Sequence, residues 1–237
     1  LHTIFQKGRK VFVSRPINHF PLDETASHSL LLGGGIGITP MIAMAHRLYA
    51  LGRDFELHYS GRSRASMAYL DDLAGFAWSD KVHLHISAES SRAKLSEIIN
   101  VRSGDTHVYT CGAEAYMAAV MQAAEQAGIP EEARHLEYFS VPELPEWENH
   151  AFTLRLVKSG FELPVPADKS AAEVLQAHGV AVDVKCSDGI CGVCQCALLG
   201  GQVEHRDFVL SNRQRESTII LCQSRASQAG GVVEVDL

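Results

Sequence analysis

Four cysteines in the C-terminal third of the chain have the spacing of an iron–sulfur site. They follow the pattern C-x4-C-x2-C and then, after 27 intervening residues, C: Cys186, Cys191, Cys194 and Cys222. Thiolates are the soft ligands that such a cluster needs, and this spacing is typical of plant-type [2Fe–2S] proteins. Gly189 and Gly192 can adopt the left-handed backbone conformations of a loop wrapped tightly around a cluster. The loop therefore predicts a [2Fe–2S] cluster.

Two other uses of these cysteines fit the pattern less well. A four-cysteine zinc site usually has two C-x2-4-C pairs, whereas here three cysteines share one loop. A disulfide framework is typical of small, cysteine-dense secreted domains, and this chain has six cysteines in 237 residues. No Cys-x-His pair lies near the loop, which excludes a Rieske centre. Cys196 falls outside the spacing, in a predicted strand from Gln195 to Leu199, and we interpret it as a packing residue.

A glycine-rich turn near the N-terminus is the second candidate site. An apolar run from Ser29 to Leu32 predicts a buried strand, which leads into the sequence GGGIGITP at residues 33–40. Apolar residues at helical spacing follow, with Thr39 as the predicted N-cap and Pro40 as the first helical residue. A turn from a strand into a helix offers backbone N–H groups and the helix dipole to a phosphate.

This turn departs from the common dinucleotide-binding pattern. It reads G-x-G-x-x-P, and a tight structural turn would look similar. The next strand, Phe55 to Tyr59, does not end in the acidic residue expected near a ribose. Polar and basic residues stand there instead, in the sequence SGRSR at residues 60–64. We still predict nucleotide binding, because a strand precedes the turn and a capped helix follows it.

Strands and helices continue to alternate as far as residue 139. The predicted helices cover residues 65–73, 94–99 and 113–127, and the predicted strands cover residues 82–87, 106–110 and 134–139. Such alternation predicts a parallel sheet with helices on both faces, in which ligands bind at the carboxyl ends of the strands. Residues 33–39, 60–63 and 111–112 all lie at such ends. Cys111 is equally compatible with a buried thiol and with a place beside a cofactor.

Histidines in the predicted strand at residues 82–87 have a simpler interpretation. His83 and His85 lie two residues apart and so share one face of that strand. They lack partners at metal-ligand spacing along the chain, which favours surface residues over ligands.

Domain boundaries follow from the change in pattern. Residues 140–150 contain two prolines and no periodicity, which is typical of a linker. Short strands and one helix with Ser170 as its cap occupy residues 151–237, around the cysteine loop. We thus expect a nucleotide-binding domain at residues 23–139, a linker at 140–150 and a small β-rich domain at 151–237. Residues 1–22, with a possible strand at 11–13, resemble the end of a preceding domain.

Composition and charge limit the partners. The net charge of −7 disfavours nucleic acid, and no apolar run is long enough to span a membrane. Cysteines that ligate iron imply a reducing compartment, so we expect a cytoplasmic protein, and we expect a monomer. The chain opens on Leu1 rather than on methionine, which leaves room for further N-terminal sequence.

The two candidate sites differ in how they handle electrons. A nicotinamide gives up two electrons at once as a hydride, whereas a [2Fe–2S] cluster accepts one at a time. A flavin normally stands between the two, and this chain has no recognisable flavin domain. We therefore expect the flavin domain to precede Leu1 or to be supplied by another protein.

Several motifs together resemble the phthalate dioxygenase reductase family, and within it the vanillate O-demethylase reductases. The matching segments are residues 34–41, 111–112, 137–139, 186–194, 205–207 and 222–225. The resemblance implies a ferredoxin-reductase-type parallel sheet followed by a plant-type ferredoxin domain of the β-grasp, α+β class. It also implies that residues 1–22 are the end of an FMN-binding barrel, although Gly8-Arg9-Lys10 stands where a Gly-Asp pair is expected.

The resemblance also implies site residues. Those expected to bind the pyrophosphate and nicotinamide are Gly35, Gly37, Thr39 and Pro40, with Thr39 and Cys111 at the reacting end. Those expected at the adenosine end are Ser60, Arg62 and Ser63, while Cys111 and Gly112 would lie by the nicotinamide and Phe139 by the flavin. The implied cluster ligands are Cys186, Cys191, Cys194 and Cys222.

The implied function is electron transfer to an oxygenase. NADH would reduce FMN, and FMN would reduce the [2Fe–2S] cluster, which would reduce a Rieske-type oxygenase or O-demethylase. Two alternatives stay open: a ferredoxin-type carrier whose first domain is only a scaffold, and a reductase for another acceptor such as a carnitine-type or other hydroxylase. Arg62 and Arg64 could also accept a 2′-phosphate, so residue chemistry leaves NADH and NADPH both possible.

Overall fold

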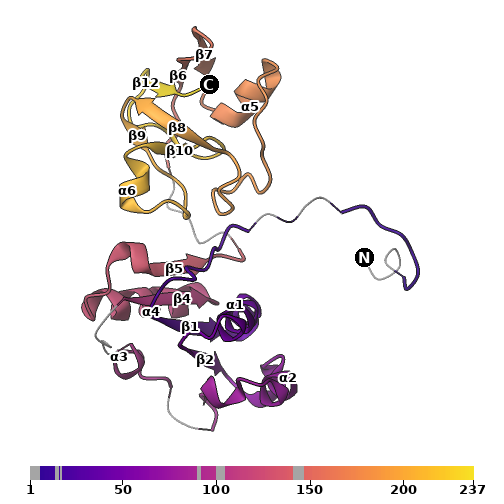
Figure 1. Ribbon diagram of the computed structural model, residues 1–237. Coiled ribbons are helices and arrows are strands. Elements are labelled where there is room, and N and C mark those ends of the chain that lie inside the picture. Colours follow the sequence, from indigo (N-terminus) through magenta and orange to yellow (C-terminus); the bar gives the residue numbers. More distant parts are fainter. Residues whose placement is uncertain (1–5, 14–15, 17, 90–91, 100–104, 141–146) are drawn as a thin grey trace.

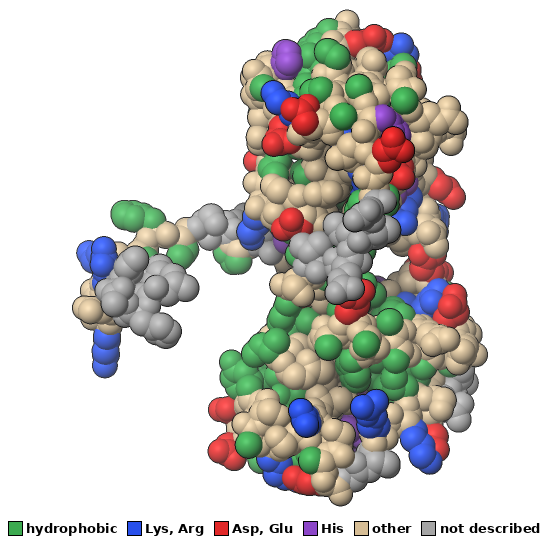
Figure 2. Space-filling model, turned by 180° about the vertical axis from the view of Figure 1, so that it is seen from behind, with side chains coloured by type: hydrophobic (Ala, Val, Ile, Leu, Met, Phe, Trp, Pro, Cys, Tyr) green, Lys and Arg blue, Asp and Glu red, His purple; other side chains and the backbone are tan. Residues whose placement is uncertain are grey.

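The computed structural model describes residues 6–13, 16, 18–89, 92–99, 105–140 and 147–237. Two lobes, each built on its own five-stranded sheet, make up the molecule, and the N-terminal segment extends away from both (Figure 1). The molecule narrows between the lobes (Figure 2). Within the described residues, no helix has both the length and the apolar character needed to cross a membrane.

A fully parallel sheet of strand order β3-β2-β1-β4-β5 forms the first lobe. Its strands are β1 (His28–Gly34), β2 (Phe55–Gly61), β3 (Val82–Ile86), β4 (Thr106–Cys111) and β5 (Arg134–Glu137). The chain moves outward from β1 to β3 and then returns to the other side of β1 with β4. This reversal makes the carboxyl ends of β1 and β4 the point at which such sheets bind ligands.

Helices cover both faces of this sheet, as the alternating pattern predicts. On one face α1 (Ile38–Ala50) and α2 (Leu70–Gly75) pack on residues such as Leu31, Leu57 and Tyr109. On the other face α3 (Leu95–Ile98) and α4 (Glu114–Gln126) pack on Leu30, Leu32 and Val108. The central strand β1 is buried on both faces, which explains its continuous apolar sequence.

The start of α1 differs from the prediction. A 3-10 turn, η1 (Gly35–Gly37), precedes the helix, and Gly37 rather than Thr39 is the N-cap. The Thr39 hydroxyl donates to the Ile36 carbonyl at 3.1 Å instead of capping. Pro40 is the third helical residue, where it is tolerated because N–H groups of the first turn have no partner within the helix. The close approach of Gly37 to the end of β4, described below, sets this early start.

Two further predictions for this region were wrong. The predicted helix at residues 65–73 is divided into η2 (Arg64–Ser66) and α2, because Met67 is extended and Tyr69 has a φ of 62°. Residues 11–13 form no strand with any described part of the chain, and the Phe12 side chain is fully exposed. A strand requires a partner for its backbone groups, and none of the described strands lies beside this segment.

A mixed sheet of order β10-β8-β12-β6-β7 forms the second lobe. Its strands are β6 (Phe152–Leu156), β7 (Phe161–Val165), β8 (Gln195–Gly200), β10 (Thr218–Ile220) and β12 (Val232–Val235). The pair β6 and β12 is parallel and its neighbours are antiparallel, while α5 (Ala171–Ala177) packs against the sheet. Ser170 caps α5 in a capping box with Glu173, as its sequence predicts. This is the β-grasp arrangement of ferredoxins.

Smaller elements complete the two lobes. They are η3 (Ser79–Lys81), η4 (Glu131–Ala133), β9 (Val203–Glu204), β11 (Arg225–Ala226) and α6 (Asn212–Arg215). Asn212 joins the lobes, since its backbone N–H donates to the Glu131 carboxylate at 2.9 Å. The rings of Tyr138 and Phe208 meet edge to face, with centroids 5.4 Å apart.

Two buried arginines hold the chain that enters the second lobe. Arg206 donates to the Asn149 side chain at 2.6 Å, and Arg225 donates to the His150 carbonyl at 2.9 Å. Each arginine is only 4% exposed. Because a buried guanidinium left without acceptors is costly, these contacts fix where the linker ends.

Candidate functional site

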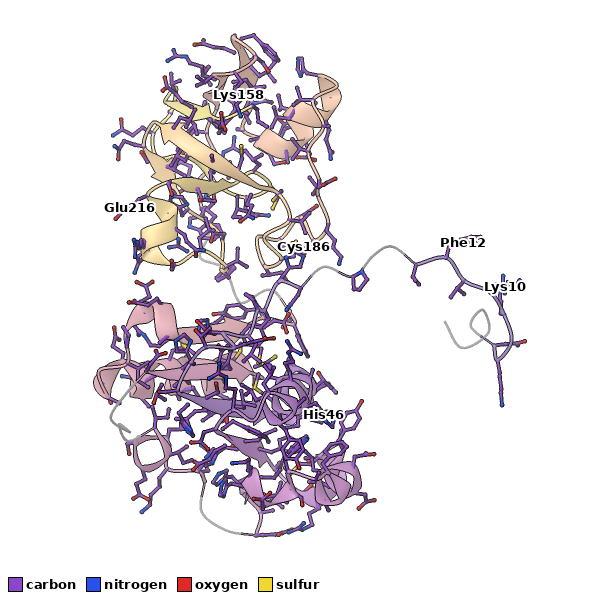
Figure 3. The ribbon with its side chains drawn as sticks, in the orientation of Figure 1. Lys10, Phe12, His46, Lys158, Cys186 and Glu216 are labelled. Carbon is purple, nitrogen blue, oxygen red and sulfur yellow. The ribbon has the colours of Figure 1, made fainter. Side chains whose placement is uncertain are left out.

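All four predicted cluster cysteines come together at one end of the second lobe. The cysteine loop runs from α5 to β8, and Cys222 follows β10, which pairs with β8. The backbone N–H of Leu221 donates to the Cys194 carbonyl at 3.1 Å, which places Cys222 next to Cys194. Cys186 lies at the end of this lobe that faces the first sheet (Figure 3).

The four thiols form two hydrogen-bonded pairs. Cys194 pairs with Cys222, and this hydrogen bond lowers the pKa of Cys194 to about 7 while it raises that of Cys222. Cys186 pairs with Cys191; burial opposes ionisation of Cys186, but hydrogen bonds from Asp188 and Cys191 bring its pKa below the ordinary value. Each iron of a [2Fe–2S] cluster needs two thiolates, and two adjacent pairs meet that requirement.

Backbone groups of the loop are directed at the sulfurs. The N–H of Asp188 donates to Cys186 Sγ at 3.3 Å, and the N–H groups of Ile190 and Cys191 also donate to this sulfur. Such donors stabilise thiolates and tune a bound cluster. Gly189 has a φ of +73°, and a side chain there would lie 3.1 Å from the Arg206 carbonyl. Donor chemistry, pairing and loop shape therefore all fit a [2Fe–2S] cluster.

Three strand-end turns of the first lobe also come together, as predicted. Gly34 of β1 is in register with Ser60 of β2, and Gly33 is in register with Cys111 of β4. The contact between the first and third turns is so close that a Cβ atom on Gly37 would lie 2.1 Å from the Cys111 carbonyl oxygen. Only glycine fits there, so Gly37 is explained by packing as well as by its proposed ligand, whereas Gly35 is explained by its φ of +57°.

Comparison with known proteins agrees with both halves of this geometry. Residues 11–133 match the family model of the dimethylamine monooxygenase subunit DmmA-like N-terminal domain, and residues 155–227 match the 2Fe-2S iron-sulfur cluster binding domain. The phenoxybenzoate dioxygenase subunit beta of Ectopseudomonas oleovorans is 40% identical over 97% of this chain and 71% of its own length. The vanillate O-demethylase oxidoreductase of Pseudomonas sp. (strain HR199 / DSM 7063) is 35% identical over 99% of this chain and 75% of its own length.

One solved structure resembles both lobes of this chain together. The structure of phthalate dioxygenase reductase, described as modular for electron transfer from pyridine nucleotides to [2Fe-2S], is 36% identical, with a TM-score of 0.56 over 94% of this chain and 70% of its own. The chain belongs to the phthalate dioxygenase reductase family. It is an iron–sulfur oxidoreductase of the type that serves oxygenases.

Within this reductase, the predicted nicotinamide residues occupy distinct positions. Thr39 and Pro40 lie in the first turn of α1, beside the glycine turn. The Cys111 side chain is completely buried, and burial together with nearby Glu137 raises the pKa of its thiol to about 12. Cys111 therefore stays a neutral thiol at physiological pH, and the part of it that borders the turn is its backbone carbonyl. Its predicted role beside the nicotinamide stays a prediction.

At the predicted adenosine end of the reductase, two polar residues already bond to neighbouring side chains. Ser63 forms a capping box with Ser66, and Arg64 pairs with Glu89 at 3.0 Å. Arg62 is exposed at the end of β2, beside half-buried Ser60. Because Arg64 already has an acidic partner, Arg62 is the better placed of the two cations to meet a nucleotide.

A groove of about 880 Å³ separates the cysteine loop from the first lobe of the reductase. Residues from both lobes line it, and they include Phe20, Leu136, Cys191, Gly192 and Phe208. Phe139, the predicted flavin neighbour, follows β5 and is 51% exposed. Sequence reasoning missed Phe20 and the Tyr138–Phe208 contact, because contacts between lobes leave no periodic signal in either segment.

Proposed function

We propose that this reductase binds NADH at the carboxyl ends of β1 and β4 and delivers electrons singly, through its [2Fe–2S] cluster, to a Rieske-type oxygenase or O-demethylase. FMN, when bound, converts the two-electron donor into a source of single electrons. The observation that carries the proposal is the position of Cys191 and Gly192, which line the groove between the lobes opposite the edge strand β5. The cluster loop therefore borders the lobe whose strand-end turns would bind the nucleotide.

Nucleotide binding in this proposal uses the three strand-end turns. The backbone at Gly35 and Gly37 would receive the pyrophosphate, with Thr39 and Pro40 next to the nicotinamide. Ser60, Arg62 and Ser63 would bind the adenosine end, and Arg62 would supply the cation. Gly112 would lie by the nicotinamide, and it also lets the third turn pack on the first, since a side chain there would lie 2.9 Å from the Gly34 carbonyl oxygen.

The flavin in this proposal lies against the exposed face of Phe139. We further propose that residues 1–22 belong to an FMN-binding barrel and that residues 23–139, 140–150 and 151–237 act as nucleotide domain, linker and ferredoxin domain. The exposed apolar side chains of Val11, Phe12 and Val13 support a packing partner for this segment. The linker residues 141–146 lie outside the described residues.

The partner in this proposal is the oxygenase, and the organic substrate binds to that partner. A cytoplasmic, monomeric protein fits the role, because the thiolate ligands require reducing surroundings. One finding favours a second acceptor class: residues 11–133 match a family model named for a dimethylamine monooxygenase. A monooxygenase or hydroxylase of another type, such as a carnitine-type enzyme, is therefore the second candidate. A simple ferredoxin carrier is less well supported, since the strand-end turns are assembled.

Arg62→Ala tests the nucleotide role. Anaerobic reduction of the holoprotein by NADH, in the presence of FMN, should require a higher NADH concentration in the variant, while the visible spectrum of the cluster stays unchanged. Arg64→Ala is the matched control, because Arg64 is paired with Glu89. If both variants use NADH like the unchanged protein, the adenosine end lies elsewhere.

A further inference from the structure

A cluster of metal-ligating side chains lies on the first sheet, away from the cysteine loop. Glu56 and His58 are on β2, and His83 and His85 are on β3. Parallel pairing sets His58 beside His83, and residues two apart on a strand share a face. All four side chains therefore lie on one face, the face on which α3 and α4 cover β1 and β4.

One distance in this cluster, that between Glu56 and His58, matches the separation of two ligands of the same ion. His58 Nε2 lies 3.4 Å from Glu56 Oε2, longer than the range of about 2.7–2.9 Å typical of a charge-assisted hydrogen bond. With bonds of about 2.0–2.1 Å to a tetrahedral zinc ion, two ligand atoms are separated by roughly 3.3 Å. One ligand atom each from Glu56, His58 and His83 all lie within 4.8 Å of one another.

We propose that Glu56, His58 and His83 bind a divalent transition-metal ion of the zinc class, with His85 orienting His58. Two imidazoles and one carboxylate are a borderline donor set, which suits Zn²⁺ better than the all-oxygen sites of Mg²⁺ or Ca²⁺. Three protein ligands leave a coordination position for water. Within the described residues, no other group of three His, Cys, Asp or Glu side chains brings its ligand atoms within 4.8 Å of one another.

His85 supplies the contact that metal-binding histidines usually have on their second nitrogen. Its Nε2 lies 3.0 Å from His58 Nδ1. When His58 donates Nδ1–H to His85, the lone pair of His58 Nε2 is left to face Glu56 and the ion. His58 is only 6% exposed, so packing holds its ring in this direction.

His83 must turn to complete the site, and it is free to do so. Its ring is stacked on that of His58, with centroids 4.6 Å apart and planes 19° apart, so the lone pairs of the two rings do not yet converge. His83 is exposed to solvent, which allows rotation about its side-chain bonds and gives the ion a route of entry. The residues are distant in sequence, which is why spacing along the chain favoured surface histidines.

A second histidine pair in the same sheet provides a matched control. His107 Nδ1 lies 3.1 Å from His135 Nε2, and His107 Nε2 lies 3.2 Å from Asp105. These two partners sit at opposite ends of the His107 ring, and no third ligand converges with either contact among the described residues. This pair therefore offers the same types of side chain as the proposed site, but its ligand atoms do not converge on one point.

Calorimetric titration of the holoprotein with Zn²⁺ tests the proposal, with cluster absorbance recorded in parallel. We expect one saturable Zn²⁺ site that raises the melting temperature and leaves the cluster absorbance unchanged. His83→Ala and Glu56→Gln should each weaken binding at least tenfold, and His85→Ala should weaken it about 10- to 100-fold. His107→Ala should bind as the unchanged protein does.

His83→Ala and Glu56→Gln are chosen because neither side chain is buried, so both variants should fold where His58→Ala could fail. Absence of saturable Zn²⁺ binding would overturn the proposal. So would Zn²⁺ binding in His83→Ala and Glu56→Gln as tight as in the unchanged protein. Uptake that bleaches the cluster equally in all variants would also overturn it, since the ion would then be bound by cysteines. Weakening by His107→Ala to the same degree would equally contradict it.

Discussion

At the scale of single residues, the predicted cluster ligands are the part of the protein that the structure supports best. The spacing of the four cysteines predicts both the ligands and the cofactor, because it is typical of plant-type [2Fe–2S] sites. The structure adds the pairing, in which Cys186 faces Cys191 and Cys194 faces Cys222. Cys196 is separate from these pairs and lies within β8, in register with Ile219 of β10.

Replacing one ligand should remove the cluster and loosen its domain. We expect Cys191→Ser to abolish the visible absorbance of the cluster and to lower the melting temperature of residues 151–237, because metal binding and folding are coupled. Cys196→Ser is the control, and this variant should keep the visible absorbance of the cluster. A stable, well-folded Cys191→Ser protein by circular dichroism, or a colourless Cys196→Ser protein, would contradict the ligand assignment.

The half-buried His135 should make the protein less stable in mild acid. Burial and neighbouring His107 lower the pKa of His135 to about 4, from 6.5 in an unfolded chain. As the pH falls from about 6.5 to about 4, the unfolded chain binds a proton that the folded protein does not, so this contribution to stability is lost over that range.

Denaturant unfolding at several pH values would measure this loss. His135→Gln should flatten the fall in unfolding free energy between about pH 6.5 and 4, relative to the unchanged protein. His178→Gln serves as a control, since His178 lies in the second lobe and caps α5 through the Val174 carbonyl. If the two variants show the same pH profile as the unchanged protein, burial of His135 does not limit acid stability.

At the scale of elements, the sequence predicts the alternation of strands and helices but not their junctions. Buried β1 and the periodic α4 follow from pattern alone. The start of α1 does not, because it depends on the contact between Gly37 and the end of β4, 74 residues further along the chain. The break at Tyr69 likewise depends on Met67, which packs against Gly61.

Crowding the glycine turn should impair nucleotide use and spare the cluster. In Gly37→Val, a Cβ atom would lie 2.1 Å from the Cys111 carbonyl oxygen, so the turn must move. We expect kcat/KM for NADH to fall at least tenfold, or ~1.4 kcal/mol, with an unchanged cluster spectrum. Gly75→Ala is the control, because nothing lies within 4 Å of its added atom. Equal loss in both variants would indicate general destabilisation.

At the scale of the whole molecule, function depends on how the lobes meet. Tyr138, Phe208, Glu131 and Asn212 join them, and the cysteine loop faces the groove between them. None of these contacts follows from sequence, because each pairs segments whose own patterns are irregular. The order of the two lobes and the kind of chemistry in each were predictable, since each lobe carries its own motif.

The most direct test of electron transfer between the lobes is an anaerobic NADH titration of the holoprotein with an FMN-loaded flavin domain added, followed by EPR and visible absorbance. We predict that NADH bleaches the oxidised cluster and produces the EPR signal of a reduced [2Fe–2S] centre, with each NADH supplying two electrons. A cluster that dithionite reduces but NADH does not would contradict the proposed function. The chain would then be an electron carrier whose first lobe is only a scaffold.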